Sequence, residues 1–155
     1  MSHCVHVIVT PIGFASVIAG RWPELPSLPH SSGFVLFPVD YDLIDAKIRP
    51  VTTPRDTGEE FMLLTTAFEQ YLCELSDGGR IAYLETEYWG GTGGQGALVF
   101  ENRKPLMTAQ WATSDTINDA LQLIGVPCPD IGDRFSAIGL EDVRSNEDIL
   151  ELIQS

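Results

Sequence analysis

One stretch of the chain, Glu85 to Ala97, combines acidic, aromatic and glycine residues at a spacing that could support chemistry. It reads E-T-E-Y-W-G-G-T-G-G-Q-G-A, so two carboxylates and two aromatic rings lead into five glycines within seven residues. Glu85 and Glu87 would share one face of a strand, where one carboxylate could raise the pKa of the other for acid–base work. No nucleophile or histidine accompanies them in this stretch, so we predict no catalytic residue and expect both on an exposed sheet face or against a basic partner.

The two aromatic residues stand where a strand would meet the glycines. Tryptophan and tyrosine dominate the energetic hot spots of protein interfaces, and an aromatic anchor ringed by carboxylates suits a basic partner with a groove. Glycine permits close approach of another backbone or a ligand. A wide, bulged hairpin loop without a function is the alternative, because glycines are common in turns. The predicted recognition surface consists of Glu85, Glu87, Tyr88, Trp89, Gly91, Thr92, Gly93 and Gln95.

The glycines formally match G-x-G-x-x-G from Gly91 to Gly96. A dinucleotide site needs a helix after that pattern, because the helix N-terminus holds the pyrophosphate. Here a run of strand composition follows, and the loop contains no lysine or arginine to offset phosphate charge. We therefore predict no nucleotide and no other cofactor.

Two further groups could suggest a site. Asp40, Asp42 and Asp45 resemble the start of a calcium loop, but the position that needs an oxygen ligand is Ile44. We predict a solvated acidic turn there and no metal site. Cys4 and His6 share a strand face like a nucleophile pair, yet the sequence offers no third orienting group nearby, so we expect a core or rim histidine.

These residues need elements that position them, and the chain supplies strands and helices in separate blocks. The last three of five strand-like runs predict an antiparallel meander, with the glycine loop joining its first two strands. The block order favours an α+β fold with a mainly antiparallel sheet. The five runs are 3–10, 34–39, 81–88, 95–101 and 106–111.

Helical periodicity is clearest over 57–75, where apolar residues form one stripe that we expect to pack on the meander. Thr57 and Glu60 have the spacing of a capping box. Two shorter C-terminal helices are predicted, one over 115–124 capped by Ser114 or Asp115, and one from about 146.

The composition limits the function. The chain has 155 residues, which suits a single domain over 1–155, and its formal net charge is -13. Such a surface repels nucleic acid and anionic membranes, so a basic protein is the expected partner. Three cysteines without metal-like spacing suit free thiols in a reducing compartment. No basic flank precedes the N-terminal apolar run, which Pro11 and Gly13 interrupt, so we predict a cytoplasmic protein.

The run 82–100, with E-T-E-Y-W-G-G-T-G-G-Q-G-A-L-V-F at its heart, and the tail 138–148 resemble segments of small uncharacterised bacterial proteins. Those proteins are similar in size and acidity to the immunity partners of bacterial toxin systems. Immunity proteins bind a cognate toxin and block its active site. The resemblance implies a binding protein of immunity or antitoxin type and brings no catalytic residues with it.

Two other hypotheses stay open. In one, the chain is a small enzyme or ligand-binding domain with a pocket under the glycine loop, where Glu85 and Glu87 hold a cationic ligand or a metal. In the other, it is a structural subunit that forms a homodimer through an exposed strand.

Overall fold

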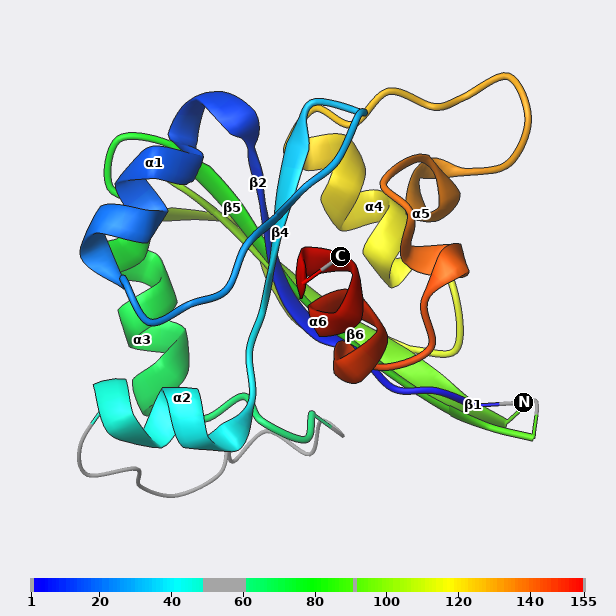
Figure 1. Ribbon diagram of the computed structural model, residues 1–155, viewed down its shortest axis with the longest axis horizontal. Coiled ribbons are helices and arrows are strands. Elements are labelled where there is room, and N and C mark those ends of the chain that lie inside the picture. Colours follow the sequence, from blue (N-terminus) through cyan, green and yellow to red (C-terminus); the bar gives the residue numbers. More distant parts are fainter. Residues whose placement is uncertain (1, 49–60, 91, 155) are drawn as a thin grey trace.

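A seven-stranded antiparallel sheet forms the centre of the molecule, as seen in a computed structural model that describes residues 2–48, 61–90 and 92–154 (Figure 1). The strand order is β3-β4-β2-β5-β6-β7, and β1 pairs with β5 beyond the end of β2. The predicted α+β fold and the β5–β6–β7 meander are confirmed. The strands are β1 Ser2–His3, β2 His6–Pro11, β3 Leu28–Pro29, β4 Phe34–Pro38, β5 Arg80–Trp89, β6 Thr92–Glu101 and β7 Lys104–Ala112.

Helices cover both faces of this sheet, with α1, α2 and α3 on one side and α4, α5 and α6 on the other (Figure 1). Their bounds are α1 Ile12–Arg21, α2 Tyr41–Lys47, α3 Thr66–Leu75, α4 Thr116–Leu123, α5 Arg134–Ala137 and α6 Asn146–Gln154, with a 3-10 turn η1 at Leu140–Asp142. Among the described residues, none of the helices combines the length and the apolar character needed to cross a membrane.

The sheet divides the core into two clusters, because successive side chains of a strand point to opposite faces. Along β5, Ile81 and Tyr83 join the cluster under α1 and α3, whereas Ala82 and Leu84 join the cluster under α4 and α6. Both faces are therefore apolar in the middle of the strand. This alternation is the one by which the sequence predicts that Glu85 and Glu87 share a face.

The predicted long helix is shorter than its apolar stripe. α3 begins at Thr66, and the Thr65 hydroxyl caps it by accepting the Phe68 N–H at 3.1 Å. Residues 61–64 are not helical, so the prediction is wrong over them; the predicted capping box lies outside the described residues. The inner face of α3 does pack on the meander, where Phe68 meets Tyr83 edge-on at 5.1 Å between ring centroids.

Two helices have no counterpart in the sequence prediction. Pro11 ends β2 and directly precedes α1, a place where its fixed φ and missing N–H cost little. The aspartates predicted as an acidic turn belong to α2 instead. The Asp40 carboxylate caps that helix by accepting the Leu43 N–H at 2.8 Å, and Asp42 lies in the first turn, where negative charge is favoured.

The glycine-rich segment is not the loop over 89–94 that the predicted strands 81–88 and 95–101 imply, and it is not the wide, bulged loop of the alternative either. β5 and β6 pair up to Trp89 and Thr92, which leaves only two residues to connect them. Gly93 and Gly94 lie inside β6. Both positions require glycine, because a Cβ would overlap the Glu87 carbonyl oxygen at Gly93 and the Trp111 ring at Gly94. The glycines thus serve close packing within the sheet.

Candidate functional site

Glu85 is a buried structural residue. Its side chain is 1% exposed. Its Oε1 accepts the Met62 N–H at 2.6 Å, and its Oε2 accepts the N–H groups of Leu63 and Leu64 at 3.0 and 3.2 Å. The Tyr83 hydroxyl also donates to Oε2, at 2.7 Å. The exposed position predicted for Glu85 is therefore wrong: the carboxylate anchors the segment before α3 by accepting three of its backbone N–H groups.

Tyr83 stays protonated at this contact. Burial and then the neighbouring Glu85 carboxylate raise the pKa of Tyr83 well above its ordinary value. The tyrosine therefore remains a hydrogen-bond donor over the whole physiological range.

Tyr88 and Gln95 connect the hairpin to α4. Gln95 Oε1 accepts the Ile117 N–H at 2.7 Å, and Gln95 Nε2 donates to the Tyr88 hydroxyl at 3.0 Å. That hydroxyl donates in turn to the Thr113 carbonyl at 2.6 Å. Asp115, one of the two predicted caps, occupies the N-cap position with a φ of 72° but makes no side-chain cap bond. A glutamine from the sheet does the capping instead, so the polar groups of Tyr88 and Gln95 are engaged in the fold.

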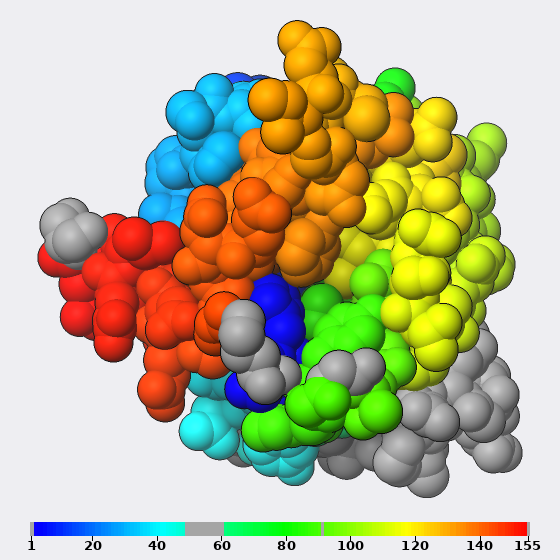
Figure 2. Space-filling view, turned by 90° about the vertical axis from the view of Figure 1, so that its right-hand side faces the viewer, coloured from blue at the N-terminus to red at the C-terminus, as the bar shows by residue number. Residues whose placement is uncertain are grey.

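A hollow of about 340 Å³ lies beside these two residues. Figure 2 views this side of the molecule, where the first residues of the chain (blue) lie between the hairpin (green) and the orange segments, and α4 (yellow) lies on the other side of the hairpin. The polar side chains along the hollow already bond to one another: His3 contacts Thr86 Oγ1 at 2.6 Å, and Asn118 donates to Asp133 at 3.1 Å. It lacks a converging set of free polar groups among the residues described.

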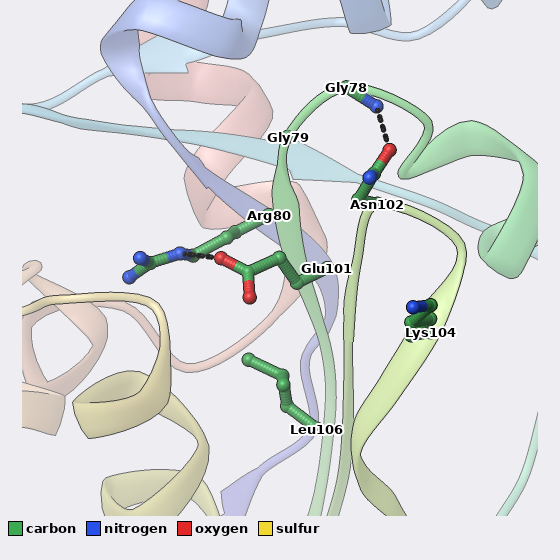
Figure 3. Close-up of a pocket in the computed structure, with 7 residues that line it drawn as sticks. All are labelled: Gly78, Gly79, Arg80, Glu101, Asn102, Lys104 and Leu106. Atoms are coloured by element: carbon green, nitrogen blue, oxygen red, sulfur yellow. Dashed lines mark hydrogen bonds and ion pairs between the residues drawn. The ribbon is translucent and has the colours of Figure 1, made fainter.

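A second hollow, of about 650 Å³, lies at the opposite end of β5 (Figure 3). Arg80 on its wall is paired with Glu101, and the Asn102 side chain accepts the Gly78 N–H at 3.2 Å (Figure 3). Its polar side chains are thus largely committed to one another, and nothing in its lining suggests an acid–base pair or a nucleophile.

Trp89 lies at the outer end of the hairpin, which projects with β1 from the sheet (Figure 1). Its side chain is 59% exposed. The indole Nε1 donates to Glu87 Oε1 at 3.2 Å, and the Thr92 hydroxyl donates to the Trp89 carbonyl at 2.9 Å. The Trp89 ring is thus held in a solvent-exposed position by its hydrogen bond to Glu87 and by the strand pairing of its backbone. Gly91, also predicted here, lies outside the described residues.

Next to Trp89, the strand register assembles a group that the sequence did not suggest. β1 and β2 both run along β5, with His3 opposite Tyr88 and His6 opposite Glu85. This pairing brings Cys4 and His6 to Glu87, and one ligand atom from each lies within 4.8 Å of the other two. The third group missing near Cys4 and His6 in the sequence comes from a strand some 80 residues away.

The electrostatics of this cluster do not favour a nucleophilic cysteine. Burial, followed by the carboxylates of Glu87 and Glu85, raises the pKa of the Cys4 thiol. Burial lowers the pKa of His6, and the same two carboxylates only partly oppose it. A reactive cysteine needs a lowered pKa, so Cys4, His6 and Glu87 do not form an activated thiol.

Comparisons of the chain with protein-family models, with curated proteins and with solved structures each gave no match. The case for a function therefore rests on the residues described above.

Proposed function

We propose that the protein is an acidic binding module that uses the outer end of the β5–β6 hairpin to hold a basic protein partner. The observation that carries the proposal is the exposed Trp89 ring, fixed by the bond from its Nε1 to Glu87. Tryptophan is among the residues most enriched at interface hot spots, and this one stands exposed beside a carboxylate. Because the ring is already held, partner binding would cost little side-chain entropy.

The negative charge of the protein supports a basic partner. The formal net charge is -13, so the molecule attracts a basic surface and accelerates its association. An inhibitor of immunity or antitoxin type, which covers a basic active-site cleft, fits this charge together with the aromatic anchor. The three cysteines are all free thiols, which supports a reducing compartment such as the cytoplasm.

The packing beside the glycines supports the binding module over the ligand-binding alternative. It required space under a wide glycine loop, but a Cβ at Gly96 would lie 2.5 Å from the Phe61 ring. Phe61 in turn packs edge-on against Trp111 at 5.4 Å between ring centroids. The volume beside the glycines is thus filled by aromatic side chains, and Glu85 is occupied by backbone N–H groups.

Trp89→Ala tests the proposal. We expect affinity for the partner to fall by about 30-fold, equivalent to about 2 kcal/mol, with the melting temperature almost unchanged. Tyr41→Ala is the matched control, because Tyr41 is an equally exposed aromatic residue (58%) on α2, outside the hairpin. It should leave affinity intact.

The partner for this measurement is first captured from the host's lysate on the immobilised protein, identified, and then purified. Affinity is measured by calorimetry at several salt concentrations, and binding to a basic partner should weaken as salt rises. Equal losses in the Trp89 and Tyr41 variants, or a collapsed melting temperature in Trp89→Ala, would refute the hairpin as the binding surface. A homodimer that persists in Trp89→Ala would favour pairing through the nine-residue edge strand β7 instead.

A further inference from the structure

The pairing of β1 and β2 with β5 creates a three-residue cluster at the edge of the proposed binding surface. Cys4, His6 and Glu87 each offer one ligand atom, and these three atoms lie within 4.8 Å of one another. We propose that Cys4, His6 and Glu87 together bind a zinc ion. This site does not depend on the proposed partner, and its test uses the metal alone.

The donor set selects the metal. A thiolate sulfur, an imidazole nitrogen and a carboxylate oxygen are the three side-chain donors that zinc accepts, whereas magnesium and calcium prefer oxygen alone. Zinc sites with three protein ligands keep a fourth position for water or a substrate. The cluster therefore resembles an open zinc site more than a closed structural one.

The spacing is compatible with coordination after a small adjustment. Zinc binds sulfur at about 2.3 Å and nitrogen or oxygen at about 2.1 Å, so tetrahedral ligands lie about 3.5 Å apart. The three ligand atoms need to approach one another by at most about 1.3 Å, a change that rotation of the Cys4 and Glu87 side chains can supply.

His6 supplies an independent sign of a missing ligand. Its side chain is 9% exposed, and its Nε2 is buried without a hydrogen-bond partner among the residues described. Buried polar atoms are almost always bonded, and an orphaned one calls for an explanation. An ion bound by this ring would explain why the sequence places a histidine in an otherwise apolar strand.

The backbone around the cluster is already fixed. The Asn146 side chain accepts the His6 N–H at 2.8 Å and donates to the His6 carbonyl at 3.1 Å. The Cys4 N–H donates to the Arg144 carbonyl at 2.8 Å. Two ligands therefore sit on a backbone clamped by the C-terminal segment, which lowers the entropic cost of assembling a metal site.

Glu87 and its neighbours complete the environment. The Trp89 indole bonds one of the Glu87 oxygens, which orients the carboxylate, and among the described residues the other oxygen accepts no hydrogen bond. Cys4 and Glu87 are both partly exposed, so an ion has a path from solvent. The buried Glu85 carboxylate adds negative potential beside the cluster.

The test is a metal titration of the full chain after chelator treatment under reducing conditions. Zinc is titrated in competition with a chromophoric chelator, and we expect one equivalent to bind. Cobalt in place of zinc should give a sulfur-to-metal charge-transfer band in the near ultraviolet, which reports directly on a thiolate ligand. Zinc should also raise the melting temperature, because it binds the folded state.

Variants separate this site from adventitious binding. Cys4→Ser should abolish the cobalt band and weaken zinc at least about 100-fold, and Glu87→Gln should weaken it at least about tenfold. Cys128→Ser, which removes the exposed thiol, is the matched control and should change neither. Far-UV circular dichroism checks that each variant folds, and the partly exposed Glu87 provides a variant that preserves the core.

Three results would overturn the proposal. One is wild-type protein that leaves zinc with the chelator. Another is a cobalt band that survives Cys4→Ser or is lost in Cys128→Ser. The third is unchanged zinc affinity in a folded Glu87→Gln.

Discussion

The β5–β6 hairpin has an inner half around Glu85 and an outer half around Glu87, and the two glutamates lie on the same face of one strand. The inner carboxylate is buried and accepts three backbone N–H groups and a tyrosine hydroxyl. The outer one is partly exposed and, within the part of the chain that the structure describes, accepts only the indole N–H of Trp89. Residue type and strand face are the same for the two glutamates. The number of hydrogen-bond donors around each carboxylate therefore determines which one is structural and which one is available to a partner or an ion.

The largest expected effect tests that comparison directly. Glu85→Ala leaves the N–H groups of Met62, Leu63 and Leu64 without their acceptor, and we expect it to reduce the free energy of unfolding by about 3 kcal/mol or more. Glu87→Ala should cost less than about 0.5 kcal/mol, as surface substitutions do. Urea denaturation monitored by circular dichroism measures both. Similar losses in the two variants would erase the distinction between the halves of the hairpin.

A medium effect tests whether the hairpin is a packed strand pair rather than a loop. Gly96→Ala places a methyl group against the Phe61 and Trp111 rings, and overpacking of this kind costs about 1–3 kcal/mol. Gly13→Ala is the control, because nothing lies within 4 Å of its added Cβ and alanine favours the helix in which it sits. A Gly96→Ala protein as stable as wild type in thermal melting would mean that the two rings do not occupy that space.

The smallest effect concerns Asp133, a carboxylate that accepts a backbone N–H like Glu85 but lies at the surface. Its Oδ1 accepts the Ser136 N–H at 2.9 Å. Burial acts to raise the pKa of Asp133, but the hydrogen bonds from Ser136 and Asn118 outweigh it and lower the pKa below the ordinary 3.8. As the pH falls, Asp133 is therefore protonated in the unfolded chain at a higher pH than in the folded protein.

The sign of the pH dependence follows from that lowered pKa. The stabilisation is complete above the unfolded value of 3.8 and is lost as pH falls through the lower folded value. At neutral pH we expect the free energy of unfolding of the wild type to exceed that of Asp133→Asn by less than about 1 kcal/mol, because solvent screens this site. Urea unfolding of both proteins at about pH 6 and about pH 3 should show the difference shrinking at the lower pH. If the difference in unfolding free energy between the two proteins is the same at both pH values, the charge of Asp133 does not cause it.

Local patterns were sufficient to predict most of the scaffold. Alternation in β5, the meander, the inner face of α3 and the C-terminal helices all follow from apolar periodicity, which the core preserves. The same patterns misjudged α2, because aspartates near a turn and aspartates that cap a helix have the same composition. They also extended α3 too far, because apolar spacing continues into residues 61–64, where Glu85 holds the backbone outside a helix.

The candidate site could be predicted only in part, for a physical reason. Trp89 is exposed beside a carboxylate as its neighbours in sequence suggest. The burial of Glu85 and the meeting of Cys4 with Glu87 depend on segments far apart in the chain. Strand register sets those contacts, and no short window of sequence contains it.

The contacts of Asn146 constrain the order in which parts of the molecule can fold. Its side chain bonds the His6 backbone and also donates to the Val39 carbonyl at 2.7 Å, so one residue near the end of the chain joins β2 to the segment after β4. During synthesis the His6 backbone thus gains this side-chain partner only after a further 140 residues have been added. All seven strands of the sheet precede α4, so the sheet can pair first, and Asn146 closes the contact between β2 and the segment after β4 later.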